Sequence, residues 1–466
     1  MSSTAPVLAP SAPPAPARSR PLRRKAHVLA AVGTMAGLVA ILAWATAVGA
    51  GEPAASPTGI PSAGRVVDWG LPLATLAGRI AAVGTVGSLL FAAVLLPGSA
   101  EGLPRRSRRA LRTAAAWALA WAVATVVGGL LTLSGLLGTA PTELSATSLR
   151  VFVEDTGAGR AALLGAVLTA AVAVAAPRCS KAGTRVLLAV ALSALLLPVV
   201  LSGHSSAAED HLPAVTTLGA HVVAATVWVG GLLGLLVHGR GAAASVAAPR
   251  FSRLALACSA ATAVTGVLAA WLVLGGSGAV LAALGTGYGA LLLAKTAGLT
   301  ALGVLGWQHR RRTLPALRAG DGRGFRRFAV GEVLLMLATV TVAVALAASP
   351  PPAVAAPTGS GPTQAGTASP TGAAADPMAG HDHGELSVGV LVDDERFHVA
   401  GPVAVGSRVT VHNSSAEQVT LTAVDGSFDI VLPPRALSTF PAPQQPGEYP
   451  FTSEHSASFA DVLVVE

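Results

Sequence analysis

The sequence predicts an all-α polytopic membrane bundle of about nine transmembrane helices, followed by a small all-β domain at the C-terminus. Long apolar stretches and basic residues on alternate loops predict the bundle. Strand-like alternation, which is confined to the end of the chain, predicts the β domain. The chain is 52% hydrophobic and only 12% charged, which is typical of a membrane protein.

Each predicted span is rich in Ala, Leu, Val and Gly and is long enough to cross a bilayer, which takes about 20 residues. The predicted spans are 27–50, 69–97, 111–138, 158–176, 185–203, 214–238, 252–274, 284–306 and 328–348. The run Ala45-Thr46-Ala47 also resembles a signal-peptidase site. We expect the first span to be retained because its apolar run is long for a signal peptide, and cleavage would leave the later topology unchanged.

Basic residues cluster before the first span and in the loops after spans two, four, six and eight, as in Arg105–Arg109 and Arg310–Arg312. The positive-inside rule places these loops and the N-terminus in the cytoplasm. An odd number of spans then places the C-terminus outside a plasma (inner) membrane. The net charge of +8 is explained by these scattered arginines, so no nucleic-acid-binding face is predicted.

Composition divides the chain into four parts. Residues 1–26 form a Pro/Ala/Ser tail that is expected to be disordered, and 27–348 form the membrane domain. Residues 349–384 form a Pro/Gly/Ala linker, and 385–466 form the extracytoplasmic β domain. The two cysteines are too far apart in the predicted topology to form a disulfide. The chain has no phosphate-binding Gly-x4-Gly-Lys-Ser/Thr loop, so an ATP-driven enzyme is not predicted.

Four ionisable residues lie inside predicted spans, where such groups are costly and indicate function or pairing. Lys295 and Glu332, on successive spans, are predicted to form an ion pair, either structural or part of a transport path. Arg79 is expected to face the bundle interior or a wet cavity. His221 lies about two turns into its span from the outer side.

His204, His211 and His221 are close in the predicted topology, near the outer face of the membrane. Neutral imidazole binds copper and zinc, and nearby carboxylates could orient the rings, so these three residues form a candidate metal site. The alternative is that they are ordinary polar residues at a loop edge. His221 fits that alternative least well, because an intramembrane histidine needs a partner.

The segment HVVAATVWVGG, from His221 through Trp228 to Gly231, resembles the His-x6-Trp-x-Gly-Gly helix of the copper-resistance protein D (CopD) family. Further similar segments are Gly203-His204, 251–266, 288–295 and the final span that contains Glu332; together the resemblance covers about 140–352. It implies copper binding and transport across the plasma membrane for copper homeostasis, with copper in an unknown oxidation state as ligand. Only Met35 and Met336 lie in spans, so a thioether route for Cu(I) is not expected.

The C-terminal segments 413–429 and 446–465 resemble the ligand-bearing loops of the cupredoxin family, which implies a β-sandwich. In that alignment Val419 replaces the first copper-binding His, Ser453 replaces the Cys, and Phe459 lies near the Met position. His455 is the one ligand position that is retained. A type 1 copper centre needs a Cys thiolate, so we predict a cupredoxin-like domain without such a centre.

The end of the linker contains His381, Asp382 and His383, preceded by Met378, and this His-x-His pattern is a second candidate metal site. His398 and His412 could complete it. The alternative is a solvated polar segment.

Copper transport, in a lipid bilayer and without enzyme activity, is therefore the expected function. An extracytoplasmic copper-binding protein is an additional candidate partner. The alternative is a membrane scaffold that delivers copper to an oxidase or a partner protein without net transport. A haem redox protein is disfavoured because no two spans offer facing histidines at equal depth.

Overall fold

The computed structural model describes the backbone of most of both predicted domains. The described residues are 20–49, 63–96, 98, 102–201, 211–274, 281, 283–313, 322–349, 389–393, 396–399, 401–434, 436–454 and 456–466. The predicted tail up to residue 19 and the predicted linker from residue 350 onward lie outside these ranges.

Within the described residues, nine helices are long and apolar enough to cross a membrane, as the sequence predicts. They are α1 (Arg20–Gly49), α2 (Arg65–Leu90), α3 (Arg105–Leu137), α5 (Gly157–Ala175), α6 (Lys181–Leu201), α7 (His211–His238), α8 (Ala242–Leu274), α10 (Gly287–Gln308) and α12 (Gly322–Ala347). Short turns extend three of them: η1 (Phe91–Leu95), η2 (Ala176–Arg178) and η3 (His309–Thr313).

Several helices begin earlier than predicted, at the end of the bundle where the arginines gather. Helix α3 begins at Arg105 and not at residue 111, and α8 begins at Ala242 and not at residue 252. In α3 hydropathy misses these turns because arginine is polar, although its aliphatic stem can lie along an apolar surface. In α8 the earlier turns are rich in Ala, with Ser245, Pro249 and Arg250 among them. We call this the arginine-rich end and the opposite one the β-domain end.

The arginines at this end also cap helix α7. The last four carbonyls of a helix have no partner within the helix. In α7 the Leu235 carbonyl accepts from the Gly239 amide at 2.8 Å. The next three carbonyls, of Leu236, Val237 and His238, accept from Arg326, Arg240 and Arg106 at 3.2, 2.7 and 3.2 Å. These side chains therefore satisfy a helix terminus as well as indicating topology.

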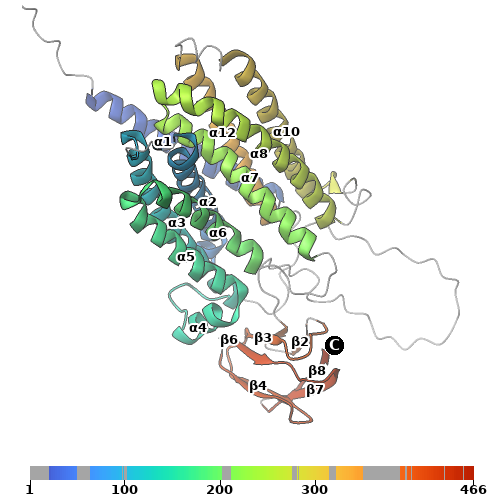
Figure 1. Cartoon of the computed structure of the whole chain (residues 1–466). Helices are drawn as coiled ribbons and strands as arrows, with labels where there is room; N and C mark the ends of the chain where they lie inside the picture. The colour runs from blue at the N-terminus through green and yellow to red at the C-terminus, as the bar shows by residue number, and fades with distance from the viewer. Residues whose placement is uncertain are drawn as a thin grey trace, which may run out of the picture.

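Helix α2 lies at the centre of the bundle and packs on α3, α6, α7 and α12 (Figure 1). Its contact with α7 is made by glycines. A methyl group added at Gly87 would lie 2.0 Å from the Gly230 carbonyl oxygen, and one at Gly234 would lie 2.3 Å from the Gly87 carbonyl oxygen. Gly230 and Gly234 form the small-xxx-small spacing that lets membrane helices approach closely.

One described helix was not predicted. Helix α4 (Ala146–Asp155) occupies what the sequence suggested was an outer loop. The Ser145 hydroxyl accepts from the Ser148 amide at 3.0 Å and caps its first turn. Phe152 is buried against Leu133, Leu137 and Ala158. The Ser cap was the available sequence signal, but the segment is too short for a hydropathy search.

The C-terminal domain consists of two four-stranded sheets within the described residues, ordered β2-β1-β3-β6 and β5-β4-β7-β8. The strands are β1 (Val390–Val392), β2 (Phe397–Val399), β3 (Arg408–Asn413), β4 (Val419–Ala423), β5 (Asp429–Leu432), β6 (Ala436–Pro441), β7 (Gly447–Ser453) and β8 (Ser456–Val465). Strands β1 and β3 are parallel, and the other strand pairs are antiparallel. Phe397, Phe428, Phe440, Phe451 and Phe459 fill the core between the sheets. The β domain is confirmed, whereas a specifically cupredoxin-like fold stays a prediction.

The β domain rests on helix α4 at the end of the bundle opposite the arginine-rich end (Figure 1). Leu437 of β6 is 1% exposed and belongs to the same apolar cluster as Phe152. Two residues further on, the Thr439 hydroxyl donates a hydrogen bond to Asp155 at 3.0 Å. Helix α4 thus forms the contact between the membrane domain and the β domain.

Candidate metal path through the bundle

His221 lies inside the bundle, ten residues after the start of α7, and faces α8. Its Nδ1 atom lies 3.0 Å from the Thr265 hydroxyl oxygen. Gly266 provides the space beside the ring, because an added methyl group there would lie 3.4 Å from His221 Cε1. At 1.5 Å per residue, the imidazole lies about 15 Å along the helix from the β-domain end of α7.

The partners of Thr265 determine which nitrogen of His221 carries the proton. A threonine hydroxyl has one hydrogen, and that of Thr265 is donated to the Ala261 carbonyl at 2.6 Å. Thr265 Oγ1 therefore accepts from His221 Nδ1–H. In the neutral ring, Nε2 then keeps its lone pair, which is the form of imidazole that binds a metal.

Lys295 of α10 lies within electrostatic range of this ring. It is eight residues from the β-domain end of α10, a depth similar to that of His221 in α7. The predicted pairing of Lys295 with Glu332 is wrong. The ionisable partner of Glu332 is His309, whose Nε2 lies 3.6 Å from Glu332 Oε2.

The geometry of the helices explains why Lys295 and Glu332 do not pair. His309 follows Lys295 by 14 residues, which is about 21 Å along α10. Glu332 lies nearer the arginine-rich end, whereas Lys295 lies toward the β-domain end. The separation in depth between Lys295 and Glu332 could have been counted along the two spans, and His309 was missed because it lies beyond the predicted end of its span.

The other predicted residues of the membrane domain are found in different surroundings. Trp228 is 5% exposed and lines a cavity on the arginine-rich side of His221. Arg79 is half-buried near the middle of α2. Gly231, of the Trp-x-Gly-Gly motif, leaves space for the Phe251 ring. The motif therefore combines a cavity wall with close helix packing.

Several predicted ligands cannot be placed. His204, Met378, His381, Asp382, His383 and His455 lie outside the described residues. The backbone of His211 begins α7, but its side chain is not described. Among the described side chains, no three His, Cys, Asp or Glu residues gather as a metal-binding group. Cys179 and Cys258 are free thiols.

In the β domain, the positions aligned with copper ligands belong to the core or to a hydroxyl pair. Val419 and Phe459 lie in the apolar core, at 2% and 7% exposure. Ser453 lies 3.5 Å, oxygen to oxygen, from the Thr420 hydroxyl. These side chains offer no thiolate or imidazole to copper.

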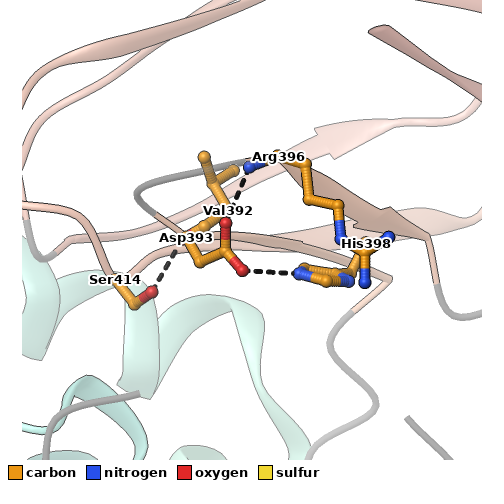
Figure 2. Close-up of polar contacts among 5 residues, drawn as sticks. All are labelled: Val392, Asp393, Arg396, His398 and Ser414. Carbon is orange, nitrogen blue, oxygen red and sulfur yellow. Dashed lines mark hydrogen bonds and ion pairs between the residues drawn. The ribbon is translucent and has the colours of Figure 1, made fainter. Parts of the chain in front are cut away.

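His398 has a defined polar partner on the turn between β1 and β2 (Figure 2). Its Nε2 donates to the Asp393 carboxylate at 2.7 Å, and the same carboxylate accepts from the Arg396 amide at 2.7 Å. The Ser414 hydroxyl donates to the neighbouring Val392 carbonyl at 2.8 Å. Since His398 uses Nε2 as the donor, the lone pair of its neutral ring is on Nδ1, whereas that of His221 is on Nε2.

The fold and these buried polar groups define a multi-pass membrane protein with an attached β domain. Residues 66–214 match the family model for the copper resistance protein D-like N-terminal domain, and residues 245–346 match that for copper resistance protein D. The two matches support assignment of the membrane domain to the copper resistance protein D family, which indicates a membrane protein related to copper resistance. Most of α7, with His221 and Trp228, lies between the matched segments. No curated protein and no solved structure matched the chain.

Proposed function

We propose that this protein binds copper and carries it across the plasma membrane, entering the bundle from the β-domain end. The observation that carries the proposal is the His221–Thr265 contact, which presents an imidazole lone pair inside an apolar bundle. The family matches support copper as the metal, since imidazole alone would suit several first-row ions.

The residues have distinct roles in this proposal. His221 is the central ligand, and the predicted entrance ligands His204 and His211 stand before it in the chain. Lys295 opposes a cation at His221 electrostatically, so it limits how tightly copper is held. Weak retention favours onward movement, because a transport site must also release its ion. The proposed direction is uptake toward the cytoplasm, with the β-domain end on the outer side in the predicted orientation.

Cellular copper tests this proposal. We would measure copper by mass spectrometry in cells that express the wild type, His221→Ala or His238→Gln, at matched protein level and with copper supplied outside. His238 is a suitable control because it also lies on α7, where it packs against Phe91 at a ring distance of 5.5 Å. We expect the wild type and His238→Gln to raise copper and His221→Ala to fail. Equal accumulation in all three would contradict the proposal.

A second candidate function is copper delivery or assembly without net transport. The observation that favours it is the contact of β6 with α4, which holds a β domain without type 1 copper ligands at the surface of the bundle. Such a domain could serve as an interaction module. Truncation after residue 352 distinguishes the two functions. If the truncated protein still raises cellular copper, transport by the bundle is favoured. If the full-length protein leaves cellular copper unchanged and cross-links to a partner protein, delivery is favoured.

A further inference from the structure

A cavity of about 180 Å³ lies between α7, α8, α10 and α12 in the half of the bundle toward the arginine-rich end. Its walls are mainly apolar and include Trp228, Leu232 and Phe251. Three ionisable side chains, His309, Arg310 and Glu332, also line it. Trp228 is seven residues after His221, so the cavity begins about 10 Å further along α7.

The Glu332 carboxyl group is in an unusual position for an acidic side chain. It is 4% exposed, and its Oε2 atom has no hydrogen-bond partner among the residues that the structure describes. Burying a carboxylate is costly unless it is paired or coordinates a cation. The His309 imidazole lies beside it, with Nε2 at 3.6 Å from Oε2, beyond ordinary hydrogen-bond length.

The His309 ring is held in place by two aromatic side chains. Phe325 stacks on it with a centroid distance of 4.9 Å and an interplanar angle of 13°, and Phe328 lies at 5.0 Å. Its Nε2 therefore points at Glu332 in a fixed orientation. A ring fixed in this way presents a preorganised nitrogen ligand.

We infer that His309 and Glu332 form a second binding site for a first-row transition-metal ion, at the end of the copper path. Metal–nitrogen and metal–oxygen bonds in such sites are about 2.0–2.1 Å long. Two ligand atoms 3.6 Å apart, each about 2.05 Å from one ion, subtend an angle of about 120° at that ion. This angle suits trigonal or distorted tetrahedral coordination.

The surroundings favour release of the ion from this site. Arg310, which also lines the cavity, donates a hydrogen bond to the Ser252 carbonyl, so its positive charge is held at the cavity wall. The carboxylate and imidazole attract a cation that the nearby guanidinium partly opposes. The inference rests on the proposed function for the identity of the ion, but its geometry is independent of His221.

Equilibrium binding of Co(II) to the purified full-length protein tests this site without a transport assay. The visible absorption bands of Co(II) report its coordination. The parent protein would carry His221→Ala, which removes the ligand on the β-domain side. Into this parent we would introduce Glu332→Gln, His309→Gln or the control His238→Gln. Glutamine preserves the size of Glu332 while removing its charge.

We expect the parent and the His238→Gln variant to bind Co(II), and the Glu332→Gln and His309→Gln variants to bind it at least tenfold more weakly. A similar unfolding temperature of all four proteins without metal would separate lost binding from misfolding, and the rise in that temperature on adding Co(II) should be smaller in the same two variants. Equal binding in all four proteins, or none in the parent, would overturn this second site. Either result leaves the His221 proposal to be decided by cellular copper.

Discussion

The membrane bundle and the β domain hold their buried histidines through different ring nitrogens and different partners. In the bundle, the hydrogen bond of His221 leaves a nitrogen lone pair available for a ligand. In the β domain, His398 uses Nε2 to donate to Asp393. The difference teaches that the count of histidines does not locate a metal site, whereas the partner of each ring nitrogen does. We propose copper binding in the bundle, to which the family matches belong, and a docking role for the β domain.

The largest expected effect comes from breaking the helix contact on which the bundle depends. Gly87→Leu would force a side chain into the Gly230 carbonyl, because even a methyl group would lie 2.0 Å from that oxygen. We expect a loss of about 3 kcal/mol in stability and aggregation during size-exclusion chromatography. Gly128→Leu is the matched control, since Gly128 of α3 has no atom within 4 Å of an added methyl group. Similar behaviour of both variants would show that the glycine contact does not hold the bundle together.

Thr265→Val tests the tautomer of His221 while keeping the ligand itself. Valine is similar in shape to threonine but cannot accept the Nδ1–H bond. We expect copper affinity of the purified protein to fall about tenfold to a hundredfold, as for other groups that orient a metal-binding imidazole. The control is Thr296→Val, whose exposed hydroxyl bonds only to its own helix, at Leu292. An unchanged affinity in Thr265→Val would remove the distinction drawn between His221 and His398.

Asp393→Ala should weaken the β domain without affecting copper. The substitution leaves the buried His398 Nε2–H without its acceptor, which costs about 1–3 kcal/mol. We expect faster backbone hydrogen exchange in β1 and β2, measured on the full-length protein. Asp425→Ala is the control, because Asp425 lies on an exposed turn where it accepts from the Ser427 amide. If Asp393→Ala lowered copper binding instead, the β domain would have a metal role.

The smallest expected effect concerns the contact between the domains. Thr439→Val removes the hydrogen bond to Asp155, worth about 1 kcal/mol, and leaves the Leu437 contact in place. We expect a broader distribution of distances between spin labels on α4 and on the β domain. Thr422→Val removes a comparable bond, to Asp429 within the β domain, and should leave that distribution unchanged. The reverse pattern would show that the domains are held together by other contacts.

The spans and the β domain were predictable because hydropathy and strand alternation depend on neighbouring residues. The depth of a side chain in a helix also followed from counting, which correctly placed His221 well inside the bundle. Side-chain partners across helices were not predictable. Thr265 is 44 residues from His221, and His309 rather than Lys295 is the partner of Glu332, because such contacts depend on helix rotation and packing.

The central claim is that copper crosses the bundle by way of His221. The most direct measurement is copper entry into sealed lipid vesicles that contain the purified full-length protein and an internal copper-sensitive dye. The account predicts rapid entry with the wild type and entry no faster than through protein-free vesicles with His221→Ala. Equal rates with the two proteins would contradict it.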